Sequence, residues 1–297
     1  MNPYVLIIIS ACIFAGQAVC LKTFSVEYRR GFASHFLNNV FFLGLTALIV
    51  LAINGATPAE NPATYIYAAV FGGVWVVSMT LYIIALQTGP TGLVTLFFSF
   101  GIIIPIIVDI AVLRTLISIF QIGGLILLFL SFYIGNKPKK GERDYITPQF
   151  IIVCLVSIVL NGIVISSAKL HQGIMPGIDV NAFVLYGFTV SVIVSAACFL
   201  FFHIRQTKKE KVTYVHMFRS PKYYGSMAGA SITTAVGNVI MVLVAGQVPA
   251  VIQFPLALGG TSIITAILSV FIFKERITKM TALIFALGIA ALVIINL

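Results

Sequence analysis

The chain has 297 residues, of which 60% are hydrophobic and only 9% are charged. A soluble domain carries charges at about a quarter of its positions, so these proportions exclude a water-facing surface and make lipid the expected solvent. The formal net charge is +10, but the basic residues lie in short segments between apolar blocks, which indicates orientation in a membrane rather than binding to nucleic acid.

Apolar blocks long enough to cross a hydrocarbon core about 30 Å thick follow one another along the chain. The predicted crossings of the first half are residues 3–22, 31–53, 64–86, 91–113 and 117–135. The predicted crossings of the second half are residues 148–169, 181–204, 223–245, 249–273 and 278–297. Turn-forming pairs such as Asn54-Gly55 and Pro176-Gly177 separate them. We therefore expect an all-α integral membrane protein with ten transmembrane helices.

The basic residues provide an independent test of this count, because loops on the cytoplasmic side of a membrane are enriched in lysine and arginine. All of the 18 lysines and arginines except Arg114 and Lys169 belong to the odd-numbered loops or the helix ends beside them. We expect those loops to be cytoplasmic. Both termini are then expected on the non-cytoplasmic side of a cell membrane, plasma or inner.

The two halves share local features. The first and sixth predicted spans both begin with a proline, Pro3 or Pro148, and end with a lysine, Lys22 or Lys169. We predict two related five-helix repeats, and an odd number of crossings in each would insert the second upside down relative to the first. The predicted units are a repeat at residues 1–136, a basic connecting loop at 137–147 and a repeat at 148–297.

Three segments carry a resemblance to a known family. They are Ala85-Leu86-Gln87-Thr88-Gly89-Pro90, Pro105 in span four, and the block 249–297 with Phe271-Ile272-Phe273-Lys274-Glu275-Arg276. With these segments the chain resembles the drug/metabolite transporter superfamily, in particular its ten-span EamA-type members. The resemblance implies a central cavity surrounded by spans one to four and six to nine, with spans five and ten at the periphery. Glu275 matches the family's acidic residue after span nine, whereas Arg114-Thr115 stand at the counterpart after span four.

Amides and aromatic rings at central depth are candidates for contact with a polar solute, since a dry cavity would need fixed donors, acceptors and stacking surfaces. The amide candidates are Gln17, Asn39, Asn161, Asn238 and Gln253. The aromatic candidates are Trp75, Tyr82, Phe98 and Tyr186. Each has an alternative role: the amides, together with Asn38, can join helices by hydrogen bonds, and the rings can face lipid.

Asp109 is the one acidic residue inside a predicted span. An ionised carboxylate in hydrocarbon is costly, so Asp109 is expected to face the protein interior or water. It is a possible proton or ion site. The alternative is that it lies close enough to the end of span four to reach headgroup water or to pair with Arg114.

Helix breakers and small residues indicate where spans bend and pack. Pro105 in span four and Pro255 with Gly259 and Gly260 in span nine are hinge candidates. Small residues at four-residue spacing predict packing faces. They are Gly225, Gly229, Thr233 and Gly237 in span eight, and Ala282, Ala286 and Ala290 in span ten.

The prediction for function is a secondary transporter that moves a small polar, zwitterionic or cationic metabolite by alternating access. A catalytic constellation, a metal-ligand cluster and a phosphate-binding glycine loop are all missing from the sequence, so neither an enzyme nor a cofactor is expected. The expected partners are the solute, the lipid bilayer and a coupling proton or sodium ion. The alternatives are a flippase for a lipid-linked group and a non-transporting membrane sensor or scaffold.

Overall fold

The structure is a computed structural model that describes residues 2–28, 32–56, 58–88, 97–98, 100–135, 147–205, 220–273 and 279–296. The predicted span-four residues 91–96 and Glu275 lie outside the described residues, as do the side chains of Lys22 and Ala282. Within the described ranges the chain is all-helical, with ten α-helices, one 3₁₀ helix and no strand.

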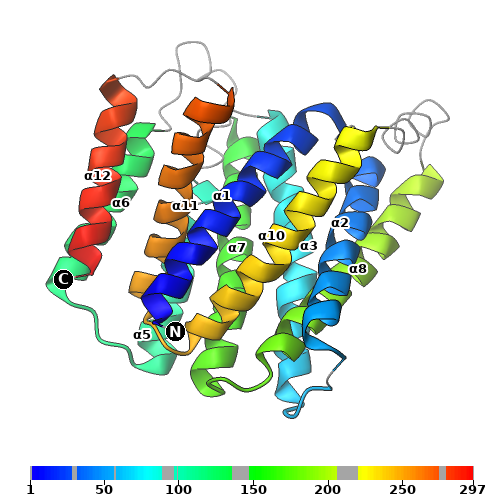
Figure 1. Cartoon of the computed structure of the whole chain (residues 1–297), viewed down its shortest axis with the longest axis horizontal. Helices are drawn as coiled ribbons and strands as arrows, with labels where there is room; N and C mark the ends of the chain where they lie inside the picture. Colours follow the sequence, from blue (N-terminus) through cyan, green and yellow to red (C-terminus); the bar gives the residue numbers. More distant parts are fainter. Residues whose placement is uncertain are drawn as a thin grey trace.

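The helices follow the predicted spans closely. In the first half they are α1 (Pro3–Tyr28), α2 (Phe32–Asn54), α3 (Ala63–Thr88), η1 (Phe100–Ile102), α5 (Ile103–Leu113) and α6 (Ile119–Gly135). In the second half they are α7 (Pro148–Ile174), α8 (Val180–Arg205), α10 (Pro221–Ala245), α11 (Ala250–Phe273) and α12 (Lys279–Ile295). All of them run roughly side by side in one bundle (Figure 1).

Six of the described helices, α1, α2, α3, α7, α8 and α10, are long and apolar enough to cross a membrane. Shorter apolar stretches lie at 100–113, 119–134, 250–265 and 286–295. These lengths and compositions support a multi-helix membrane architecture, while the total of ten crossings stays a prediction.

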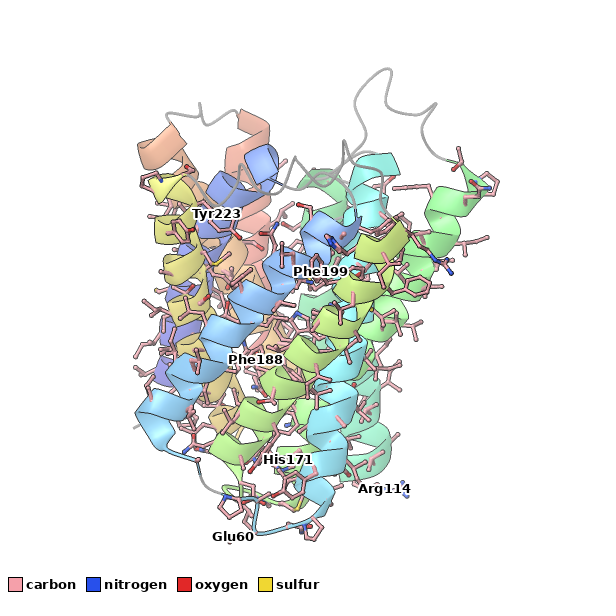
Figure 2. All side chains as sticks on the ribbon, turned by 90° about the vertical axis from the view of Figure 1, so that its right-hand side faces the viewer. Glu60, Arg114, His171, Phe188, Phe199 and Tyr223 are labelled. Atoms are coloured by element: carbon pink, nitrogen blue, oxygen red, sulfur yellow. The ribbon has the colours of Figure 1, made fainter. Side chains whose placement is uncertain are left out.

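Both chain termini lie at one end of the bundle, which we call the termini end (Figure 1). The turn from α7 to α8 lies at this same end, so α1 begins where α7 finishes. Arg114, Glu60 and His171 lie at the termini end, and Tyr223 lies toward the opposite end (Figure 2).

The most extensive packing joins helices of the first half to helices of the second half. The main pairs are α1 with α10 and α11, α2 with α8 and α10, α3 with α7 and α8, α5 with α7, and α6 with α12. The two predicted halves therefore interlock along their whole length, and neither has a core of its own that excludes the other.

Small residues allow the closest of these approaches. A methyl group on Gly72 of α3 would overlap the carbonyl oxygen of Gly187 in α8, so these two helices touch backbone to backbone. In α10 the predicted face is used in the same way, since Gly229 lies against Cys20 and Gly237 against Phe14, both in α1.

The predicted alanine face of span ten is wrong where it can be checked. Ala286 and Ala290 are exposed, and α12 instead buries Ala291 and Ile295. These two residues lie next to Gly124 of α6. Because α12 packs mainly on α6, with a smaller contact to α11, much of its circumference is left for lipid, and small residues on that part carry no packing information.

Local sequence explains several helix ends. Thr147 caps α7 by accepting a 3.2 Å hydrogen bond from the Phe150 amide, and Pro148 occupies the first helical position, where no donor is needed. Pro105 follows η1, because its ring crowds the carbonyl four residues earlier and favours the tighter 3₁₀ turn at Phe100–Ile102.

Candidate functional site

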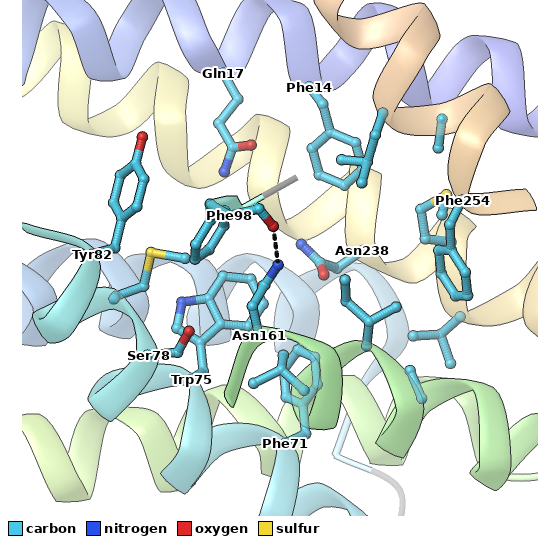
Figure 3. A pocket seen from close by; sticks show the side chains of 18 of the residues that line it. Phe14, Gln17, Phe71, Trp75, Ser78, Tyr82, Phe98, Asn161, Asn238 and Phe254 are labelled. Carbon is cyan, nitrogen blue, oxygen red and sulfur yellow. Dashed lines mark hydrogen bonds between the residues drawn. The ribbon is translucent and has the colours of Figure 1, made fainter. Parts of the chain in front are cut away.

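A cavity of about 410 Å³ lies between α1, α2, α3, α7, α10 and α11 (Figure 3). Its volume falls within the range of about 300–1,000 Å³ that small-molecule sites occupy. Three of the lining helices precede residue 136 and three follow residue 147. A molecule held there would touch both halves of the chain.

Eight of the nine sequence candidates line this one cavity. They are Gln17, Asn39, Trp75, Tyr82, Phe98, Asn161, Asn238 and Gln253. Tyr186 lies elsewhere, with its ring 4.8 Å from that of Tyr65 between centroids. Asn38 joins helices instead, because its Oδ1 accepts a 2.6 Å hydrogen bond from the Tyr223 hydroxyl. The binding role of the eight lining residues stays a prediction.

Aromatic rings form much of the cavity wall. Trp75 packs edge-on against Phe71 at 5.0 Å and against the fully buried Phe188 at 5.5 Å. Tyr82 and Phe98 form a second pair with centroids 4.6 Å apart. Since these rings hold one another in place, the wall is rigid and presents a preformed surface for a flat apolar group.

The cavity amides have orientations that their partners dictate. Three of them donate from nitrogen to a backbone carbonyl: Asn161 Nδ2 to Phe98 at 3.2 Å, Asn238 Nδ2 to Thr234 at 2.9 Å, and Gln253 Nε2 to Met241 at 2.8 Å. A carbonyl oxygen can only accept, so each bond orients its amide and uses one N–H, which leaves the amide oxygen and the second N–H of each residue. The Asn161 bond, drawn in Figure 3, also satisfies a carbonyl close to the interruption of span four.

Among the described residues that line the cavity, none is an aspartate, glutamate, lysine or arginine. Two polar lining residues were not among the sequence candidates, His35 and Ser78. His35 stands one helical turn before Asn39 and faces it, with 3.2 Å between Nε2 and Asn39 Nδ2. Spacing by four residues on α2 was the signal that would have found it.

Asp109 has a different partner from those considered in the sequence. It is 2% exposed, and its Oδ1 lies 3.4 Å from Nζ of Lys169, which is 4% exposed. Arg114 contacts Asp109 only through the backbone, where its N–H bonds the Asp109 carbonyl oxygen in a left-handed turn that ends α5. Lys169 is therefore a buried residue of α7 and does not extend from a helix end toward headgroups.

The same ion pair holds the turn between α10 and α11. Lys169 Nζ donates to the carbonyl oxygens of Ala245 at 2.7 Å and Val248 at 2.8 Å, and Asp109 Oδ2 accepts from the Ala250 amide at 2.7 Å. The cation thus meets the C-terminal end of α10 and the anion the N-terminal end of α11, where each charge is favourable. We call these five residues the ion-pair clamp.

The ion-pair clamp lies directly beside the cavity. Ala168 lines the cavity and is the residue before Lys169 of the clamp. Ala245 also lines the cavity, and its carbonyl oxygen accepts from Lys169 Nζ. Because α5 and the α10–α11 turn are at the termini end, the clamp lies on that side of the cavity (Figure 1).

A second polar cluster ties the halves together at the termini end. Asp179 accepts hydrogen bonds of 2.9 Å from the amides of Glu60 and Asn61, which precede α3, and from the Thr64 hydroxyl in its first turn. Partial burial acts to raise the pKa of the Asp179 carboxyl, but these donors and the nearby His171 outweigh it and hold the pKa below its usual range.

His171 completes this cluster and is fully buried. Its Nε2 lies 2.9 Å from Thr64 Oγ1, and its Nδ1 lies 2.9 Å from Gln172 Nε2. Gln172 also donates to Ile178 and accepts from Gly177, which sets its amide orientation. His171 Nδ1 must therefore be an acceptor, and the imidazole is a neutral structural link.

The hinge candidates occupy distinct surroundings. Pro105 is buried at the third position of α5, where a missing N–H costs no helical hydrogen bond, and Pro255 is inside α11, where it does. Gly259 packs against Leu292 of α12 and Gly260 against Ala11 of α1. The bending role of all four stays a prediction.

The comparisons with known proteins bear on the fold of the chain. No family model matches the chain, and no curated protein matches its sequence. A solved structure described as "Crystal structure of protein" is similar over 100% of this chain and 99% of its own, with a TM-score of 0.74 and 9% identity. At that identity the likeness shows a shared fold alone.

Proposed function

We propose that the protein is a secondary transporter that moves a small solute across a membrane by alternating access. The observation that carries the proposal is the cavity between the two halves, which gathers eight residues selected from the sequence for solute contact. A site shared by two interlocked halves is where rocking of one half against the other changes access.

The packing of the helices supports the inverted repeat that this mechanism needs. If each of the five elements of the first half is exchanged with its counterpart five places later, α1–α10 becomes α7–α3, α3–α8 becomes α10–α2, and α1–α11 becomes α7–α5. Each of these is an observed pair, while α2–α8 and α6–α12 map onto themselves. That pattern is expected of two equivalent units related by a twofold axis.

In this transport cycle, the ion-pair clamp and the Asp179 cluster would close the cavity toward the termini end. Both join the halves at the termini end, and both would have to separate for the cavity to open there. On the charge distribution along the chain, this is the non-cytoplasmic end. The clamp also gives Asp109 a cation within the protein, so we assign it to closure in preference to ion coupling.

The experiment is solute counterflow in liposomes containing the purified protein, with a broad panel of labelled metabolites. The matched variants are Ala168→Phe, which fills the cavity, and Ala69→Phe, which adds the same ring at an exposed position of α3. Counterflow that Ala168→Phe abolishes and Ala69→Phe preserves is the expected result. Scrambling of a lipid-linked group without solute flux would instead favour a flippase, and silence over the whole panel would favour a sensor.

A further inference from the structure

The chemistry of the cavity wall restricts what the solute can be. The wall combines aromatic rings, aliphatic side chains, amides, the Ser78 hydroxyl and the His35 imidazole, and none of the described residues that line it is an acid, a lysine or an arginine. A zwitterion or an ion would lose its hydration on entry and find no fixed opposite charge among these residues, which is unfavourable. The wall therefore favours an uncharged solute.

The orientations of the cavity amides determine which hydrogen-bond acceptors a solute would meet. Each of Asn161, Asn238 and Gln253 uses its nitrogen on a protein carbonyl. Gln17 does the same toward Thr234, whose hydroxyl hydrogen is already donated to the Ala230 carbonyl. The amide oxygens are left as acceptors beside the second N–H of each amide, and N–H or O–H donors on a solute would match these oxygens.

Gln253 has the most clearly unsatisfied acceptor among the cavity amides. Its side chain is fully buried, it lines the cavity, and its Oε1 accepts no hydrogen bond from the described residues. A buried acceptor without a donor is unfavourable, and a bound donor would relieve that penalty. Ser78, 1% exposed beside Trp75, has an Oγ in the same wall that bonds none of the described residues (Figure 3).

We propose that the cavity binds an uncharged molecule with a flat aromatic body and at least one N–H or O–H donor, the donor pairing with Gln253 Oε1 and the ring lying among the Phe71, Trp75, Tyr82 and Phe98 side chains. This narrows the solute of the proposed transporter and rests on that function for its biological meaning. Binding itself is measurable without transport.

Trp75 makes the test direct, because it is the single tryptophan of the chain and lines the cavity. Its fluorescence would be titrated in nanodiscs with benzamide, which is uncharged and has two donors. The matched probes are N,N-dimethylbenzamide without donors, benzoate as anion, benzyltrimethylammonium as cation and phenylalanine as zwitterion. Benzamide is expected to bind at least about tenfold more tightly than each of the others.

Substitution of Gln253 separates the donor contact from general packing. Gln253→Met keeps the side-chain volume and removes the acceptor oxygen. It should therefore weaken the binding of benzamide by about tenfold and leave the affinity for N,N-dimethylbenzamide unchanged. Gln247→Met, at an exposed position in the α10–α11 turn, is the matched control and should change neither affinity. Asn238→Leu gives a second test of the same kind if Gln253→Met does not fold.

Three results would overturn the inference: a charged probe binding more tightly than benzamide, equal affinities for benzamide and its dimethyl analogue, or no binding by any probe. Its failure is distinguishable from failure of the transport proposal. Benzamide binding without flux of any solute would contradict the transport proposal and support the proposed ligand class. Cavity-dependent flux of a charged solute would support transport and contradict the proposed ligand class.

Discussion

At the scale of single residues, Asp179 is a hydrogen-bond acceptor that joins the start of α8 to the segment before α3 and to the Thr64 hydroxyl. Loss of its carboxylate should cost about 1.5–3 kcal/mol of stability at neutral pH, as for other hydrogen bonds to charged groups. Because its pKa is lowered in the folded state, this stability is present above the unfolded carboxyl pKa, about 3.9, and disappears as the pH falls through the folded value.

The difference in thermal stability between the wild type and Asp179→Asn should accordingly be largest at neutral pH and shrink toward strongly acidic pH. Thermal unfolding in detergent across that range measures it. Glu60→Gln is the control, since Glu60 contacts Asp179 only through its backbone amide. A difference that does not change with pH would contradict the role of the Asp179 carboxylate as an ionised acceptor.

Asp109 and Lys169 form a buried ion pair, so removal of one partner leaves the other as an uncompensated charge. Asp109→Asn or Lys169→Met alone should destabilise the protein by about 3–5 kcal/mol, and the double variant should cost clearly less than the sum. Arg114→Gln should have little effect, because its side chain is not the partner. Additive single effects in thermal unfolding would show that the pair is not coupled.

At the scale of helices, the contact between α3 and α8 depends on the absence of a side chain at Gly72. Gly72→Ala forces the two backbones apart and should cost about 1–3 kcal/mol or more. The neighbouring Gly73→Ala meets nothing within 4 Å and should be neutral or stabilising. Thermal unfolding of the two variants compares them directly, and equal stabilities would mean that the backbone contact is not formed.

The positions of the helices could be predicted from the sequence because the length of an apolar run is a local property. α2 and α10 begin and end within two residues of their predicted limits. α7 continues to Ile174, five residues past Lys169, because that lysine is neutralised inside the protein and does not mark the membrane surface. Hydropathy alone cannot distinguish those two situations.

The candidate cavity residues could be predicted for a related reason, since amides and a tryptophan at central depth need a polar or protected environment. The interaction partners of individual polar residues could not be predicted from the sequence. Asp109 and Lys169 are 60 residues apart in sequence, and only the crossing of α5 and α7 brings them together. His35 was missed because the candidates were restricted to amides and aromatic rings, although its spacing of four residues from Asn39 places both on one helix face.

At the scale of the whole molecule, the two predicted halves pack against each other around the cavity, and two polar clusters join them at the termini end. If the halves are equivalent, as we propose, two packings of the same helices are the expected outcome. The account therefore requires the cavity to be reachable from each side of the membrane in turn.

Thiol labelling of the cavity tests this requirement without knowledge of the solute. A cysteine at Ala168 would be introduced after replacement of Cys12, Cys20, Cys154 and Cys198, with Leu48→Cys as a lipid-facing control. The account predicts that a membrane-impermeant thiol reagent labels Ala168→Cys from either side of oriented vesicles. Labelling from one side alone, however long the exposure, would contradict it.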